Sequence, residues 1–167
     1  MSEARLPQMT PVEILNANTP QIPPVDVEKI ARELGLPIHR RSDLTSDVAG
    51  MIIKDRRHPS PSGFAIHVNA NDNLRRQRFT IAHEIAHYIL HRDLIGDGIT
   101  DDALYRSSLG DIYERQANRM AADILMPASL LRTYYREKTP AIAPLAHAFD
   151  VSMEAMAIRL NELRLGP

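Results

Sequence analysis

The stretch from Phe79 to His91 constrains this chain more than any other part of its sequence. Its apolar residues recur at helical spacing, and it contains His83-Glu84-x-x-His87. On an α-helix the two histidines lie one turn apart, about 6 Å along the axis, so both can reach one tetrahedral zinc ion. Glu84 projects about 100° around the helix, where a carboxylate can take a proton from metal-bound water. The motif therefore predicts a zinc-dependent hydrolase with His83 and His87 as metal ligands and Glu84 as the catalytic residue.

Composition limits the alternatives. The 167 residues suit one domain, and 44% are hydrophobic and 25% charged, as in ordinary globular proteins. The net charge is −1, so no global positive field attracts nucleic acid. Because the chain has no cysteine, disulfides, thiolate ligands and a cysteine nucleophile are excluded, and a zinc site must use histidine and carboxylate. With no signal-peptide pattern and no long apolar run, we expect a cytoplasmic protein without membrane contact.

Local signals divide the chain into a Pro-rich arm over 1–24, a main domain over 25–130 and a helical segment over 131–167. A capping box at Thr10 and Glu13 predicts a short helix in the arm. Periodicity and caps predict strands over 37–40, 48–54 and 63–69, and helices over 26–34, 73–92, 111–126, 141–149 and 153–164. We expect an α+β fold in which a small, mostly antiparallel sheet packs on the motif helix and a second ligand helix.

A catalytic zinc site needs a third protein ligand and an open position for water. Glu114 and Asn118 share one face of the predicted helix 111–126, beside small alanines that allow close helix packing. We expect Glu114 to bind the metal and Asn118 to hydrogen-bond a ligand histidine. His91 is an alternative ligand, but it lies about 12 Å from His83 along an unbroken helix, so a supporting role fits it better. Asp111 is a weaker alternative.

Two further features leave choices open. Tyr88, Tyr105, Arg106 and Tyr113 are all candidates to stabilise a tetrahedral oxyanion, and the sequence does not choose among them. The segment 93–110 reads mostly as a loop, and its aspartates (Asp97, Asp101 and Asp102) predict an acidic rim that favours basic substrates.

Two motifs resemble those of the ImmA/IrrE family of bacterial and phage metallopeptidases. They are Arg78-Phe-Thr-Ile-Ala-His-Glu-Ile-Ala-His87 and Glu114-Arg-Gln-Ala-Asn-Arg-Met-Ala-Ala-Asp-Ile-Leu-Met-Pro127, the second being the more specific. Met120 stands where phenylalanine is common in the family. The resemblance implies a thermolysin-like (gluzincin) core, with zinc on His83, His87 and Glu114 and with Glu84 catalytic. It also implies a protein substrate, namely a helix-turn-helix (XRE-type) repressor whose cleavage derepresses stress or mobile-element genes.

The C-terminal pattern over 141–164 resembles a helix-turn-helix, with Phe149 and Val151 around the turn and Ser152 as a cap. Its second helix begins with Met153 and Glu154 and aims no basic or amide side chain at bases. We therefore expect this pair of helices to pack on the main domain or to dock a substrate, and direct DNA binding to be absent. A DNA-binding regulator, a non-catalytic zinc-bound protein and a toxin–antitoxin component remain alternatives, and the oligomeric state is not predicted.

Overall fold

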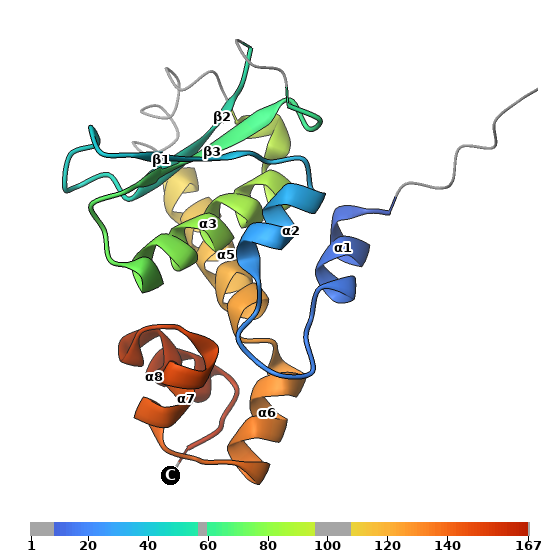
Figure 1. The fold of residues 1–167 in the computed structure, drawn as a ribbon, viewed down its shortest axis with the longest axis vertical. Helices are drawn as coiled ribbons and strands as arrows, with labels where there is room; N and C mark the ends of the chain where they lie inside the picture. Colours follow the sequence, from blue (N-terminus) through green and yellow to red (C-terminus); the bar gives the residue numbers. More distant parts are fainter. Residues whose placement is uncertain (1–8, 57–59, 96–107, 167) are drawn as a thin grey trace, which may run out of the picture.

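The computed structural model describes residues 9–56, 60–95 and 108–166. Within these ranges the chain has an α+β fold in which a small sheet lies at one end over several helices and a helical group forms the other end (Figure 1). The predicted fold class is confirmed at this level. No helix in the described ranges is both long and apolar enough to span a bilayer.

The sheet has three strands in the order β1-β3-β2: β1 is Ile38–Arg41, β2 is Gly50–Lys54 and β3 is Phe64–Asn69. The expectation of a mostly antiparallel sheet is wrong for one of its two pairings, because β2 is antiparallel to β3 but β1 is parallel to it. The most apolar strand, β3, takes the centre, where both of its faces are largely buried. The β2–β3 pairing is antiparallel, and β1 runs opposite to β2, so β1 must pair with β3 in parallel.

The sheet packs on α3 (Leu74–Leu90), the helix that carries the motif, and α5 (Ser108–Leu125) lies against α3. The core joins Ile66 and Val68 of β3 to Ile81 and Ile85 of α3. Four alanines of α3 and α5 are fully buried, so the two helix backbones can approach closely: Ala82, Ala86, Ala117 and Ala121. The 3-10 turn η1 (Arg92–Leu94) follows α3, and α2 (Val27–Glu33) packs on α3 beside β1.

Each predicted helix that falls in the described ranges is confirmed within a few residues. In the arm, α1 (Pro11–Ala17) begins at the predicted capping box, where both reciprocal hydrogen bonds form. Asp26 caps α2, and Asn73 caps α3. Gly35 follows α2 with φ of 74°, a left-handed conformation that glycine adopts without strain. The limits placed at residues 24 and 130 stay a prediction.

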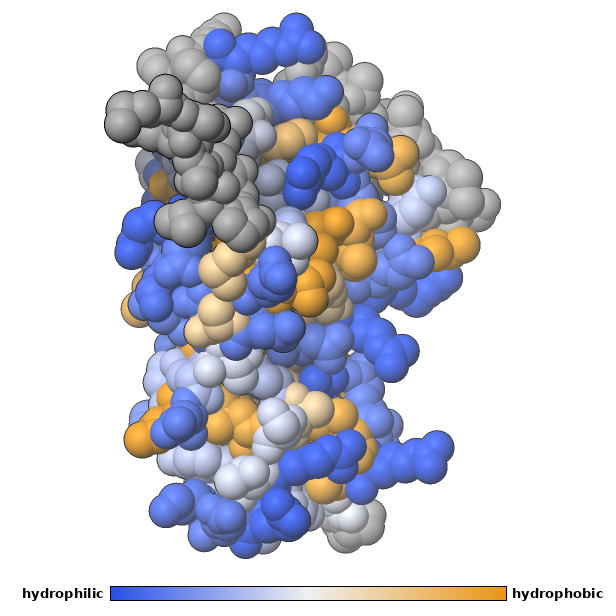
Figure 2. All heavy atoms as spheres, turned by 90° about the vertical axis from the view of Figure 1, so that its right-hand side faces the viewer, coloured by the Kyte–Doolittle hydropathy of each residue, from blue (hydrophilic) through white to orange (hydrophobic). Residues whose placement is uncertain are grey.

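The helical group at the other end consists of α6 (Ala128–Glu137), α7 (Ile142–Phe149) and α8 (Met153–Glu162). Asp150 closes α7 in the left-handed conformation, and Ser152 caps α8. On one face of the molecule, apolar side chains reach the surface in two separate areas with a hydrophilic band between them (Figure 2). Whether α7 and α8 act as a DNA-binding helix-turn-helix stays a prediction.

Candidate metal centre

Three side chains from α3 and α5 converge on one point. Nε2 of His83 lies 3.0 Å from Nε2 of His87, and Oε1 of Glu114 lies 3.0 Å from Nε2 of His87. Oε2 of Glu114 lies 3.2 Å from Nε2 of His83. Within the described parts of the chain, this is the one group of at least three such residues with the spacing of a metal site.

The donor atoms fit a metal ion in both spacing and chemistry. In a tetrahedral site with bonds of about 2.0 Å, neighbouring ligand atoms are roughly 3.3 Å apart. The two histidine nitrogens are 3.0 Å apart, and the two oxygens of Glu114 lie 3.0 and 3.2 Å from them, one oxygen facing each nitrogen, which is close to that value. Two imidazole nitrogens and a carboxylate oxygen also form a donor set that suits zinc and similar cations. The site can therefore hold one cation with three protein ligands.

Interactions between the candidate ligands shift the pKa values of His83 and Glu114 in the metal-free protein. Burial by itself lowers the pKa of His83, but the hydrogen bond with Glu114 and the charges of Glu84 and Glu114 outweigh it, so the pKa is raised. Burial raises the pKa of Glu114, but hydrogen bonds and charges from both histidines hold it far below its ordinary value. Glu114 is therefore an anion that can bind either a proton-bearing histidine or a metal ion.

A second layer of hydrogen bonds holds the histidine rings from behind. Nδ1 of His83 lies 2.9 Å from Oδ1 of Asn118, as expected from the shared face of Glu114 and Asn118. Nδ1 of His87 lies 3.0 Å from Nδ1 of His91, and Nε2 of His91 lies 2.8 Å from Oε1 of Gln116. Each candidate ligand ring is thus bonded at the nitrogen that faces away from the three converging atoms.

His91 does not join the converging donors. The helix ends at Leu90, and His91 is its C-cap with φ of −129°. His91 is 6% exposed, and its ring packs against that of Tyr113, with ring centroids 4.8 Å apart. Burial lowers the pKa of His91, partly offset by the hydrogen bond with Gln116. The structure places His91 behind His87, in the supporting position expected from the sequence, but its role stays a prediction.

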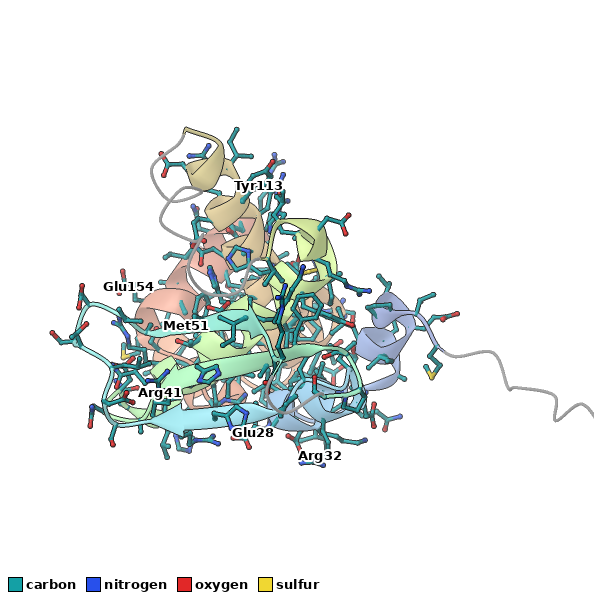
Figure 3. All side chains as sticks on the ribbon, turned by 90° about the horizontal axis from the view of Figure 1, so that it is seen from above. Glu28, Arg32, Arg41, Met51, Tyr113 and Glu154 are labelled. Carbon is teal, nitrogen blue, oxygen red and sulfur yellow. The ribbon has the colours of Figure 1, made fainter. Side chains whose placement is uncertain are left out.

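Glu84 lines a cleft beside these donor atoms and is 5% exposed. The same cleft is lined by Met51 and Ile52 of β2 and by Tyr113 of α5. Seen from above, Met51 lies between Tyr113 on one side of the molecule and Glu28 and Arg32 on the other (Figure 3). Glu84 therefore borders a space that is also lined by an apolar strand, a tyrosine and two of the candidate metal ligands, His87 and Glu114.

The remaining sequence candidates separate clearly. Tyr88 is buried, with its ring packed edge-on against Phe64 and under the guanidinium of Arg92, which makes it part of the core. Tyr113 lines the cleft, so it is still a candidate to donate a hydrogen bond to an oxyanion. Tyr105, Arg106 and the acidic residues Asp97, Asp101 and Asp102 lie outside the described residues. Asp111 is exposed and is absent from the converging group.

Gln116 is a site residue that the sequence patterns do not indicate. It is exposed and lies two positions after Glu114, outside the Glu114–Asn118 face. A contact with His91 depends on how α3 ends and how α5 crosses it, so no local pattern predicts it.

The fold and the site define a class: an α+β protein whose candidate metal centre is built by two histidines of α3 and a glutamate of α5. A family profile described as the IrrE N-terminal-like domain matches residues 31–161, which is more than half of the chain. The chain therefore belongs to the ImmA/IrrE family of metallopeptidases, as its two motifs indicated.

Curated relatives agree with this assignment. The chain is 36% identical over 112 residues to the radiation response metalloprotease IrrE of Deinococcus deserti, covering 64% of this chain and 39% of that protein. It is 36% identical to IrrE of Deinococcus radiodurans, covering 61% and 32%. It is 34% identical over 68 residues to the metallopeptidase ImmA of Bacillus subtilis, covering 41% and 37%. The matched parts thus span about two fifths or less of each relative.

A solved structure, a transcriptional regulator of Mycobacterium tuberculosis, has a similar fold. The TM-score is 0.56 with 16% sequence identity, and the alignment covers 81% of this chain and 39% of the other. At this identity the likeness concerns the fold alone.

Proposed function

We propose that this chain is a zinc-dependent endopeptidase in which His83, His87 and Glu114 hold the metal and Glu84 is the catalytic residue. The observation that carries the proposal is the convergence of the two histidine Nε2 atoms, 3.0 Å apart, on the carboxylate of Glu114, whose two oxygens lie 3.0 and 3.2 Å from them, beside the buried Glu84. Membership of a metallopeptidase family supports the same interpretation.

The proposed chemistry assigns one task to each side chain. A zinc ion held by His83, His87 and Glu114 would supply Lewis-acid chemistry, which acidifies water and polarises a carbonyl. Glu84 would act as the general base toward a water in the cleft and return the proton to the leaving amine. Asn118 accepts a hydrogen bond from Nδ1 of His83 and holds its ring with Nε2 toward the other donors. Tyr113, at the wall of the cleft, is the described residue best placed to donate a hydrogen bond to an oxyanion.

We propose that substrate binds in extended form along β2. This strand is at one edge of the described sheet, and its residues Met51 and Ile52 line the cleft. An edge strand can pair with an added peptide strand through backbone hydrogen bonds, which positions a peptide without strict sequence requirements. Protein rather than small-molecule substrate also agrees with the names of the relatives, which are called metalloproteases or metallopeptidases.

The proposed substrate class is a helix-turn-helix repressor, whose cleavage in the cytoplasm derepresses stress or mobile-element genes. It rests on the family resemblance. DNA binding by the chain itself is disfavoured by Arg159, which is 4% exposed and whose side chain is bonded to the carbonyl of Met126 and to Asp123. This guanidinium is held inside the protein and cannot neutralise a phosphate. The exposed first turn of α8 presents Met153 and Glu154 instead.

The test is incubation of the zinc-loaded chain with helix-turn-helix repressors encoded beside its gene. We expect a single cleavage by the wild type, none by Glu84→Gln with zinc still bound, and none by Glu114→Gln with zinc lost. The matched control is Glu154→Gln, an exposed glutamate of α8, which should cleave normally. Cleavage that persists in Glu84→Gln would refute the catalytic assignment. Salt-dependent binding of duplex DNA that survives removal of zinc would favour the regulator alternative.

A further inference from the structure

The two histidines of the candidate metal centre are supported from behind in different ways. His83 is bonded directly to an amide oxygen, Oδ1 of Asn118, at 2.9 Å. His87 reaches an amide oxygen only through an intermediate ring: Nδ1 of His91 at 3.0 Å, and then Oε1 of Gln116 at 2.8 Å from Nε2 of His91. Both chains of hydrogen bonds end on α5, the helix that also supplies Glu114.

The positions of the protons in the longer chain follow from what His87 must do. A neutral imidazole has one N–H and one lone pair, so Nε2 of His87 can bind a metal only when Nδ1 carries the proton. Nδ1 of His87 then donates to Nδ1 of His91, which must be the unprotonated nitrogen of that ring. The proton of His91 therefore lies on Nε2 and is donated to Oε1 of Gln116.

The reverse set of proton positions satisfies the same hydrogen bonds between His87, His91 and Gln116, but it places a proton where the metal has to bind. If the amide nitrogen of Gln116 pointed at His91, it would donate to Nε2 of that ring. His91 would then donate from Nδ1 to Nδ1 of His87, and the proton of His87 would lie on Nε2, where the ion has to bind. The orientation of one exposed amide thus decides which nitrogen of the His87 ring is free.

We propose that Gln116 is a positioning residue that, as a hydrogen-bond acceptor acting through His91, fixes His87 in its metal-binding tautomer. The inference rests on the proposed metal centre and extends it to a residue outside the donor set. His91 is suited to transmit the choice because it is 6% exposed and its ring packs against Tyr113, so it is not free to turn toward water. Gln116 is exposed, so it can be changed without disturbing the core.

The experiment replaces Gln116 with two side chains of similar length. The carboxylate of glutamate can only accept a hydrogen bond from His91, whereas the thioether of methionine accepts no comparable bond. Zn²⁺ affinity is measured by competition with a chelator for wild type, Gln116→Glu, Gln116→Met and the exposed neighbour Arg115→Met as control. We expect Gln116→Glu to bind as tightly as wild type or more tightly, and Arg115→Met to be unchanged. Gln116→Met should bind 10–100-fold more weakly, the usual effect of losing such a supporting bond. The visible spectrum of the Co²⁺ form should change in Gln116→Met and stay unchanged in Gln116→Glu.

A second arm asks whether the effect passes through His91. In a His91→Phe background, which removes the intermediate ring, Gln116→Met should cause no further loss of Zn²⁺ affinity. Should that background fail to fold, as judged by its melting curve, the Gln116 variants alone still decide the matter.

Wild-type affinity in Gln116→Met would overturn the proposal, as would an equal loss in Gln116→Met and Gln116→Glu, since the side chain would then act by shape. The outcome is separable from the proposed hydrolysis. If the variants bind zinc in the expected order but the wild type cleaves nothing, the peptidase proposal is refuted and the role of Gln116 stands. A wild type that takes up no Zn²⁺ would refute both.

Discussion

Gly50, the first residue of β2, lies where the strand crosses α3, and the structure leaves no room there for a side chain. A Cβ at this position would lie 2.5 Å from the carbonyl oxygen of His67 and 2.5 Å from Cγ2 of Thr80, whereas ordinary contact begins near 3.4 Å. Gly50→Ala must therefore move β2 by about 1 Å away from β3 or α3. Because one of the two contacts is with the backbone of the central strand, we expect a loss near the upper end of overpacking costs, about 2–3 kcal/mol.

The assay is equilibrium unfolding of the metal-free protein, in which this loss corresponds to a fall in Tm of about 4–12 °C for a chain of this size. Thr80→Ser removes Cγ2 and keeps the hydroxyl, so Gly50→Ala should cost about 1 kcal/mol less in that background. Met51 and Ile52 follow Gly50 and line the cleft, so a displaced β2 should also raise KM in the proposed peptidase reaction.

Gly63→Ala is the matched control. Gly63 has φ of 82°, and a Cβ added to it would meet nothing within 4 Å, so its substitution costs only the backbone strain of about 1–2 kcal/mol. That cost should be the same with Thr80 or Ser at position 80. A loss below about 0.5 kcal/mol for Gly50→Ala, or one that Thr80→Ser leaves unchanged, would refute the steric argument.

Three other predictions concern charges. Arg159→Met removes the 3.1 Å bond to the buried carbonyl of Met126 and should cost about 2–3 kcal/mol in urea unfolding, whereas Asp123→Asn should cost below about 1 kcal/mol because that carboxylate is half exposed. Arg78→Lys cannot bond the carbonyls of Val25 and Asp150 together, so backbone hydrogen exchange should rise near both residues while α6 is unaffected. Glu114 raises the pKa of His83 against the effect of burial. Protonation of His83 therefore stabilises the folded, metal-free protein fully below about pH 6.5, and this stabilisation is lost as the pH rises through the folded pKa. As the pH rises above about 6.5, the Tm of the chelator-treated protein should thus fall more in wild type than in His83→Gln, and an equal slope would contradict this.

Most of the secondary structure follows from local signals. Side-chain caps at Thr10, Asp26, Asn73 and Ser152 each begin a helix where the sequence predicts one. The sheet topology does not follow in this way, because strand periodicity says which face is buried but not which strand is the neighbour. The parallel β1–β3 pairing arises only when the most apolar strand takes the central position.

The candidate site is likewise predictable only in part: the pairs within each helix follow from the sequence, whereas their approach depends on tertiary packing. His83 and His87 are related by one helical turn, and Glu114 and Asn118 by another, so each pair is visible in the sequence. The approach of the two pairs rests on the packing of α3 against α5, which small residues suggest but do not determine. Gln116 lies outside both patterns, because its partner His91 follows the end of α3 and its position depends on the tertiary structure.

The groups proposed to hold and orient the metal come from α3, from its C-cap His91 and from α5, so the site depends on the register between the two helices. A slip of α5 by one residue moves its side chains by about 1.5 Å and 100°, which would remove Glu114, Gln116 and Asn118 from their partners together. The C-terminal helices contact both elements away from the metal: Asp150 pairs with Arg75 and Arg78 of α3, and Arg159 bonds Met126 and Asp123 at the end of α5. Residues 141–162 therefore brace the register that the site needs. Loosening these contacts should weaken metal binding without any change in the ligands, which assigns this segment a structural task whether or not it also docks a substrate.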